Sequence, residues 1–226
     1  MIRLAIEGQG RSSRIYPLAP ADWHYVTVVM RRAIGDAIEV MTADGQVWQA
    51  QLLDRGVQLQ VPLMRHGLPR REITLYQALL KGDHFSAVID RATQAGVMHF
   101  VPVLTERCIV REVTAAKARR WRLVAKEASE QSRRAYIPDV GEMLSLAELR
   151  LPPQSEGFVL DPQGEYRRVW LSQSVQPLSL VIGPEGGWSA GELEVLQAGG
   201  FDRISLGEGI FRAENAGAFA AILFLQ

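Results

Sequence analysis

The stretch LVIGPEGGWSAGELEVLQAGG, residues Leu180–Gly200, decides the fold class of this chain. It opens with an apolar run typical of a buried strand, continues through a glycine-rich turn and ends in a helix-forming segment. Ser189 and Glu192 have the S-x-x-E spacing of a capping box, which predicts a helix that ends at Gly199–Gly200. A strand, a glycine turn and a helix in this order are typical of an α/β fold.

The glycine turn itself, Gly183–Gly187, differs from a phosphate-binding loop. Such loops present backbone N–H groups and avoid negative charge, whereas Pro184 has no N–H and Glu185 is a carboxylate. The turn therefore suits a ligand that is not polyanionic, held through close backbone approach, with a carboxylate near a cation. S-adenosylmethionine, which carries a sulfonium, is one such ligand. A turn that is purely structural is the alternative reading.

The chain beyond residue 70 alternates between strand and helix patterns. Strands are predicted at 73–80, 97–104, 157–162, 178–183 and 203–207, and helices at 83–96, 114–134, 189–199 and from about 212. Because a strand–helix–strand order connects parallel strands, this part predicts a parallel sheet.

A second cluster, SLGEGIFRAENA at Ser205–Ala216, follows the last predicted strand. Glu214 in a first helical turn is favourable to the helix dipole, but Arg212 lies against it, so a role other than stability is expected for Arg212. Ligands of parallel α/β sheets gather beyond the carboxyl ends of the strands. The turns at Leu160–Asp161, Gly183–Gly187 and Leu206–Gly209 are therefore predicted to form one pocket.

The first seventy residues predict a small β-rich unit. A hairpin is expected at 35–54 around Asp44-Gly45, with further strands at 3–6 and 56–64. Residues 21–32 fit either a strand or a helix. The polar segment 65–72, with Gly67 and Pro69, is the predicted linker, which gives domains at 1–69 and 70–226.

Composition and charge narrow the class of protein. The 226 residues are 47% hydrophobic and 22% charged with no net charge, as in a globular protein. Residues 107–134 carry nine Lys/Arg against three Asp/Glu, which fits either a surface for a polyanion or a solvated helix face. Of the 25 basic residues 22 are arginine, a bias that favours RNA. The single cysteine, Cys108, is expected to be a buried residue in a reducing cytoplasm. The four histidines have no metal-ligand spacing, and the apolar run 218–225 is too short to span a bilayer.

The chain resembles a known family, the 16S ribosomal RNA uridine N3-methyltransferases (RsmE-type), within the SPOUT class of knotted methyltransferases. The resemblance covers nearly all of residues 72–226 and extends to 24–40, which is similar to the family's N-terminal RNA-binding barrel. It is carried by ITLYQALLKGD (73–83), IDRATQAGV (89–97), PVLTER (102–107), KEASEQSRR (126–134), LVIGPEGGWSAGEL (180–193) and LGEGIFRAENA (206–216).

The resemblance implies an α/β parallel-sheet SPOUT domain with a C-terminal trefoil knot, preceded by a small PUA-like β-barrel. It implies S-adenosyl-L-methionine-dependent methylation of uridine N3 in 16S rRNA of the small ribosomal subunit, by a cytoplasmic homodimer without metal or membrane contact. A non-catalytic RNA-binding assembly factor, or an enzyme of the same fold acting on another RNA, is the alternative. The chain departs from the family at Glu208 and Gly209, where proline and arginine are usual, and at Trp188, which replaces phenylalanine and is expected to be structural.

The same resemblance assigns the site residues. Arg212 is the predicted catalytic residue, which would stabilise the developing uracil anion, and no general base is assigned. The predicted RNA-binding residues are Arg31, Arg32, Lys81, Arg91 and Arg134. The predicted cofactor-binding residues are Leu160, Asp161, Val181, Ile182, Gly183, Pro184, Glu185, Gly186, Gly187, Leu206, Gly207 and Ile210.

Overall fold

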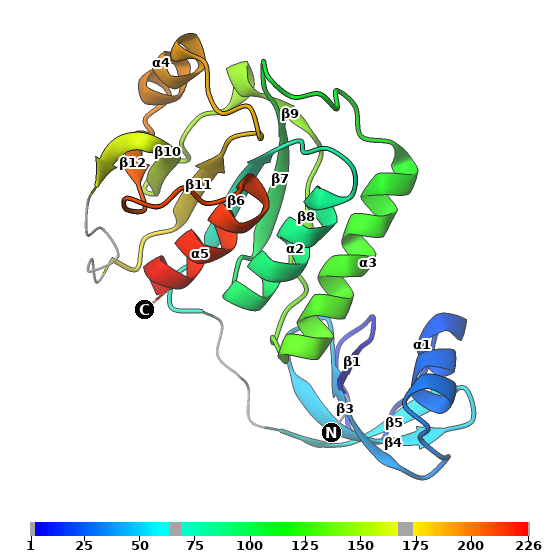
Figure 1. Ribbon diagram of the computed structural model, residues 1–226. Coiled ribbons are helices and arrows are strands. Elements are labelled where there is room, and N and C mark those ends of the chain that lie inside the picture. Colours follow the sequence, from blue (N-terminus) through cyan, green and yellow to red (C-terminus); the bar gives the residue numbers. More distant parts are fainter. Residues whose placement is uncertain (1–2, 64–68, 167–173, 226) are drawn as a thin grey trace. The chain divides into compact units, whose positions relative to one another are not determined.

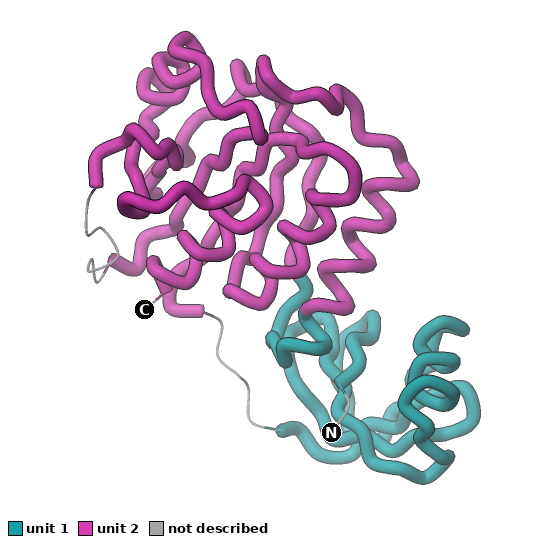
Figure 2. Tube along the Cα trace, in the orientation of Figure 1, with its two compact units in different colours: residues 1–68, 129–137 teal, residues 69–128, 138–226 magenta. Residues whose placement is uncertain are grey.

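The structure is a computed structural model that describes residues 3–63, 69–166 and 174–225 (Figure 1). The chain forms two compact units (Figure 2). Unit 1 holds residues Met1–Leu68 and Ser129–Ile137, and unit 2 holds Pro69–Ala128 and Pro138–Gln226. The predicted linker at 65–72 lies partly outside the described residues.

Unit 2 is built on a parallel sheet. Its strand order is β12-β10-β11-β6-β7-β8, with β9 paired to β7 at the far end, and every pairing is parallel. The predicted α/β fold with a parallel sheet is therefore confirmed. The strands are β6 (Ile73–Ala78), β7 (His99–Leu104), β8 (Asp139–Val140), β9 (Leu144–Ser145), β10 (Glu156–Tyr166), β11 (Leu178–Ile182) and β12 (Asp202–Ser205).

Helices cover both faces of this sheet. One face carries α2 (His84–Ala95), α5 (Ala213–Leu225) and the part of α3 (Ala115–Ser132) that belongs to unit 2. The other face carries α4 (Ala190–Ala198) and the short 3-10 helix η2 (Leu146–Glu148). All five residues of β11 are buried, because a strand covered by helices on both faces has no solvent-exposed side.

Alternation along β11 sorts its side chains between the two layers. Leu180 and Ile182 pack in the layer of α2 and α5, whereas Val181 packs in the layer of α4. This parity decides which residues of the strand reach the site described below.

The local signals for helix ends are confirmed. Ser189 and Glu192 form the reciprocal capping box of α4, with Ser189 Oγ accepting the Glu192 N–H at 3.3 Å and Glu192 Oε2 accepting the Ser189 N–H at 2.9 Å. Helix α2 ends at Gly96, whose φ of 105° is the left-handed conformation that glycine adopts without a side-chain penalty. Asp83 holds the N-cap position of α2, but its side chain makes no capping bond.

Strand β10 is longer than predicted and is interrupted. The predicted strand ends at residue 162, but β10 continues to Tyr166. Its pairing with β12 shifts register between Leu160 and Glu165, so the residues between them bulge out of the ladder. Gly164 lies so close to β12 that a Cβ there would meet the backbone of Ile204 at 2.5 Å. The backbones can approach this closely because residue 164 has no side chain.

Unit 1 contains a five-stranded sheet of order β1-β3-β4-β5-β2. The pairing of β1 with β3 is parallel and the others are antiparallel, with the predicted hairpin formed by β3 and β4. No pairing of β1 with β2 is found in the described residues, so closure into a barrel stays a prediction. The strands are β1 (Arg3–Ala5), β2 (Ile15–Pro17), β3 (Ala37–Met41), β4 (Val47–Leu53) and β5 (Gly56–Pro62).

The ambiguous segment at 21–32 is helical up to Val29, with α1 (Pro20–His24) running into a π-helical turn, η1 (Tyr25–Val29). The sequence predicts that residues 129–137 belong to the domain at 70–226. In the structure they belong to unit 1, where Glu130 Oε1 accepts the Ala5 N–H at 2.7 Å and Arg3 donates to the carbonyl of Arg133 at 2.6 Å.

Candidate functional site

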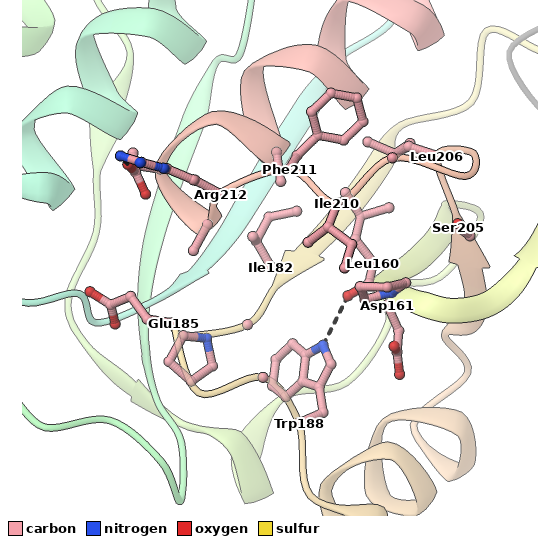
Figure 3. Close-up of a pocket in the computed structure, with 18 of the residues that line it drawn as sticks. Leu160, Asp161, Ile182, Glu185, Trp188, Ser205, Leu206, Ile210, Phe211 and Arg212 are labelled. Atoms are coloured by element: carbon pink, nitrogen blue, oxygen red, sulfur yellow. Dashed lines mark hydrogen bonds and ion pairs between the residues drawn. The ribbon is translucent and has the colours of Figure 1, made fainter.

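A cavity of about 470 Å³ lies in unit 2 at the bulge of β10 and at the carboxyl ends of β11 and β12 (Figure 3). The segment between β12 and α5 forms one of its walls. The structure thus brings together the three turns that the sequence predicts at this edge. The predicted residues that line the cavity are Leu160, Asp161, Ile182, Gly183, Pro184, Glu185, Gly187, Leu206, Ile210 and Arg212.

Three predicted cofactor-binding residues do not line the cavity. Val181 points into the α4 layer, on the opposite face of the sheet from its neighbour Ile182. Gly186 lies against Arg107, whose Cβ would be 3.2 Å from a Cβ at residue 186. Gly207 has a φ of 132°, so a backbone requirement accounts for glycine at this position.

The glycine turn is fixed by hydrogen bonds from the loops that follow β6 and β7. Glu185 Oε1 accepts the backbone N–H of Lys81 at 3.0 Å. Arg107 Nη1 donates to the carbonyl of Gly186 at 2.8 Å. The Glu185 side chain therefore points toward the loop that bears Lys81. In Figure 3 it lies on the opposite side of the view from Asp161. Its carboxylate accepts one hydrogen bond, from the Lys81 N–H.

Trp188 closes the other side of the turn. Its Nε1–H donates to the carbonyl of Leu160 at 2.9 Å, which ties the residue after the glycine turn to β10 (Figure 3). A Cβ at Gly183 would lie 3.0 Å from the Trp188 ring, so glycine allows this ring to pack there. The expected structural role of Trp188 is thus combined with a place in the cavity wall.

The charges around the cavity are mostly negative. Asp161 Oδ2 is 2.9 Å from Arg203, and its Oδ1 accepts the Gln163 N–H at 2.9 Å. Arg212 is largely exposed, with its Nη1 3.9 Å from Glu214 Oε1. Three carboxylates and one guanidinium among the lining residues disfavour a polyanion and suit a ligand with cationic groups.

Further residues line the cavity outside the predicted set. They are His84, Pro162, Trp188, Ser205, Phe211, Ala213, Glu214 and Ala216, while Gly209, which also lines the cavity, belongs to the predicted turn Leu206–Gly209. Most belong to the segment around Arg212 that the sequence had singled out as a cluster. His84 had no such signal, because only the packing of α2 against α5 brings the start of α2 to this edge.

The five predicted RNA-binding residues are divided between the units. Arg31 and Arg32 are exposed after the π-helical turn of unit 1, with Arg32 Nη1 4.0 Å from Asp36 Oδ2. Arg134 also belongs to unit 1 and is half-buried. Lys81 and Arg91 are exposed in unit 2, where Arg91 donates to Asn215 Oδ1 at 2.5 Å. This bond joins α2 to the first turn of α5.

The described parts of the chain contain no group of three or more His, Cys, Asp or Glu side chains placed to hold a metal ion. Their helices include none that is long and apolar enough to cross a membrane.

Comparison with known proteins adds the family. Residues 67–225 match the model of an RNA methyltransferase domain. The chain is 34% identical over 88% of its length to the ribosomal RNA small subunit methyltransferase E of Synechocystis sp., of which it covers 69%. It is 30% identical to the protein of the same name from Bacillus subtilis, covering 87% of this chain and 84% of that one.

A solved structure shares the fold over nearly the whole chain. It is a methyltransferase of Legionella pneumophila in complex with its bound cofactor SAM, 27% identical, with a TM-score of 0.90 over 99% of this chain and 96% of that one. The match of the family model and the identity to the Synechocystis relative both span most of the present sequence. The chain therefore belongs to the ribosomal RNA small subunit methyltransferase E family and carries its RNA methyltransferase domain.

Proposed function

We propose that this protein transfers a methyl group from S-adenosylmethionine to N3 of a uridine in the 16S RNA of the small ribosomal subunit. The observation that carries the proposal is the cavity at the bulge of β10 and the carboxyl ends of β11 and β12, in a chain of this family. The choice of N3 rests on the resemblance described above.

The residues present suit the cofactor. The cavity volume of about 470 Å³ lies within the roughly 300–1,000 Å³ of small-molecule sites. Leu160, Ile182 and Leu206 offer apolar surface for an adenine ring, and the cavity carboxylates offer attraction for its positive groups. Gly183 keeps free the space that a side chain would take from the Trp188 ring. When bound, the cofactor supplies a methyl group on a positively charged sulfur.

Arg212 is the proposed catalytic residue. Its guanidinium is exposed at the cavity, and Glu214, at 3.9 Å, is the carboxylate beside it. A uracil ring that loses its N3 proton develops negative charge on its carbonyl oxygens, and a cation beside them stabilises that charge more strongly in the transition state than in the ground state. The cavity residues named above would hold the cofactor beside Arg212.

Several finer features belong to the same proposal. Unit 1 would be the PUA-like RNA-binding domain, with Arg31, Arg32 and Arg134, and unit 2 the SPOUT domain, with Lys81 and Arg91 as its RNA contacts. The passage from the edge strand β12 to α5, which packs against α2 and β11, is consistent with the trefoil knot.

The active enzyme would be a homodimer. Four large apolar side chains are exposed on α5 and on the segment before it, namely Ile210, Phe211, Phe219 and Ile222. The ring centroids of Phe211 and Phe219 lie 5.0 Å apart. Large apolar side chains gathered in this way are typical of a surface that another protein covers.

The test uses small-subunit RNA from cells that lack the protein. The RNA is incubated with purified protein and S-adenosylmethionine, digested, and its nucleosides are separated by mass spectrometry. We expect one 3-methyluridine, with a primer-extension stop at the modified site because N3 lies on the Watson–Crick edge. A ribose-methylated or C5-methylated product with read-through would contradict the proposed reaction, and no product at all would favour an RNA-binding assembly factor.

A further inference from the structure

One ionisable side chain in the cavity wall has no role in the reaction described so far. His84 is the first residue of α2 and lines the cavity together with Arg212 and Glu214. Its side chain is exposed, and among the described residues its ring makes no hydrogen bond or ion pair. Only its backbone is engaged, with the N–H donating to the carbonyl of Lys81 at 3.3 Å.

The position of His84 is fixed although its ring is free. The α2 helix packs against α5 through the apolar layer that includes Phe85 and Ala220. Arg91, two turns along α2, donates to Asn215 in the first turn of α5 at 2.5 Å. The start of α2 and the segment that bears Arg212 are therefore held at the same edge of the sheet.

Methylation at N3 needs a group that accepts a proton. The N3 nitrogen of uracil carries a hydrogen, and its electron pair becomes available for a new bond only as that hydrogen leaves. The carboxylates at the cavity are already engaged, Asp161 by Arg203 and Gln163, and Glu185 by the Lys81 N–H. Glu214 faces Arg212. His84 is the lining group whose proton-accepting atoms are uncommitted in the described structure.

We propose that His84 is the general base that removes the N3 proton, an inference that rests on the function proposed above. The N3–H proton passes to a ring nitrogen of neutral His84, and the electron pair left on N3 forms the bond to the methyl carbon. The carbon–sulfur bond breaks with its pair going to sulfur. The positive charge of the sulfonium thus ends on the imidazolium, whose exposed ring returns the proton to water.

An imidazole suits this step because a base is most effective when its ordinary pKa lies near the working pH. Several charged groups surround it. Lys81 and Asp83 precede it, Arg91 follows on α2, Glu185 lies on the glycine turn, and Arg212 and Glu214 lie at the start of α5. Hydrogen bonds from Ser86 and from Arg120 of α3 lower the pKa of Asp83, so its carboxylate is a weaker base than an imidazole at neutral pH.

The first experiment compares the wild type with His84 variants in single-turnover methylation of small-subunit RNA across pH. His84→Gln should lower the rate at neutral pH on the order of 10²–10⁴-fold, the usual contribution of a general base, with cofactor affinity unchanged by calorimetry. Its rate should also rise with hydroxide over the range in which the wild type levels off. Added imidazole should restore part of the activity of His84→Ala. His99→Gln is the matched control, because that ring bonds to Glu72 and does not line the cavity.

A second readout needs neither cofactor nor turnover. The ring nitrogens of His84, labelled with 15N and assigned through the His84→Gln spectrum, should shift when substrate RNA is added. RNA that already carries 3-methyluridine at the target should shift them less, because it has no N3 proton to donate.

The outcomes separate the two proposals. If His84→Gln forms 3-methyluridine at the wild-type rate with the wild-type pH dependence, His84 is not the base, and the proposed function stands. Identical ring shifts with methylated and unmethylated RNA would likewise overturn the role of His84. If the wild-type protein forms no 3-methyluridine, the proposed function fails and the inference with it.

Discussion

Gly183 shows how a single residue controls the shape of the cavity in unit 2. A Cβ there would lie 3.0 Å from Cε2 and 3.2 Å from Nε1 of Trp188. The φ of Gly183 is not in the left-handed region, so the effect of a substitution is steric and local. Gly207 is a poorer place for such a test, since its φ of 132° would strain any other residue.

We therefore expect Gly183→Val to displace the Trp188 ring and to break its hydrogen bond to Leu160. Restoring the cavity around the cofactor should cost about 1–3 kcal/mol, the typical range for overpacking together with a lost hydrogen bond, so S-adenosylmethionine should bind roughly 5- to 150-fold more weakly. Calorimetry measures the affinity and circular dichroism the fold. Gly191→Ala is the control, because its added Cβ has no heavy atom within 4 Å and it lies on α4. Unchanged affinity in the valine variant would contradict the proposed site.

Arg212 gives a second prediction at this scale. Arg212→Ala should reduce kcat on the order of 10²–10³-fold, the typical effect of removing one group that stabilises a developing anion. The dissociation constant of the cofactor should change little, since the charge that Arg212 meets appears only in the transition state. Steady-state kinetics and calorimetry check the two halves separately. Arg150→Ala is the control and should behave as wild type, because Arg150 does not line the cavity. If Arg212→Ala weakened cofactor binding and left kcat unchanged, Arg212 would be a cofactor-binding residue and not a catalytic one.

Residue identities in the cavity could be predicted where glycine, proline and charge follow a strand end, as at Gly183, Pro184 and Glu185. The sequence could not show that Val181 lies outside the cavity. Its position depends on which alternate side chains of β11 point toward α5 and which toward α4. His84 could not be included, because it comes from an element that starts about a hundred residues before the glycine turn. Long-range packing, and not local pattern, decides both cases.

At the scale of elements, α3 carries the central part of the basic band at 107–134, with Arg119, Arg120 and Arg122. Its charges are partly paired, with Arg120 3.0 Å from Asp83 and Arg122 3.7 Å from Glu142. Both pairs are exposed and contribute little to stability, so their arginines can still reach a phosphate. Arg119 is exposed, and the described residues show no ion pair for it.

Neutralising Arg119, Arg120 and Arg122 to glutamine should weaken RNA binding and flatten its dependence on salt. The slope of log K against log salt should fall by up to about 0.7–0.9 for each phosphate that the variant no longer neutralises. Fluorescence anisotropy with labelled RNA at several KCl concentrations measures this slope. Cofactor affinity should stay constant, because none of the three lines the cavity. A slope equal to that of the wild type would show that this face of α3 is only solvated.

The order of strands and helices in unit 2 could be read from the sequence, since each apolar run is bounded by glycine or by capping residues. The short strands β8 and β9 were not predicted, because two residues show no periodicity. The extension of β10 to Tyr166 was also missed, because a bulge containing Pro162 and Gly164 has the composition of a loop.

At the scale of the whole molecule, the exposed apolar residues around α5 predict a dimer. Phe219→Arg together with Ile222→Glu should give a monomer in sedimentation velocity and should abolish methylation if the second copy completes the site. Both side chains are more than two-fifths exposed in the single chain, so the monomer fold should persist. Val195→Asp, on α4 and similarly exposed at 40%, is the control. A double variant that remains dimeric would place the interface elsewhere.

Which residues belong to each of the two units could be predicted only in part. A β-rich start and an α/β remainder follow from the change in periodicity near residue 70. The membership of Ser129–Ile137 in unit 1 does not, because it depends on the bonds of Arg3 with Arg133 and of Glu130 with Ala5, which join residues more than a hundred positions apart.

The bulge of β10 has a consequence for how this family can vary in length. Leu160 is in register with Ile182 of β11 and Ile204 of β12, and Glu165 and Tyr166 are again in register with β12. The four residues between are thus held at both ends, and Gly164 leaves no room against Ile204. Leu160 and Glu165 both pair with Ile204, so an insertion or deletion between them would change the size of the bulge and displace Asp161 and Pro162, which line the cavity. Among natural relatives, gaps in aligned sequences should therefore avoid residues 161–164, and lineages should differ in length elsewhere.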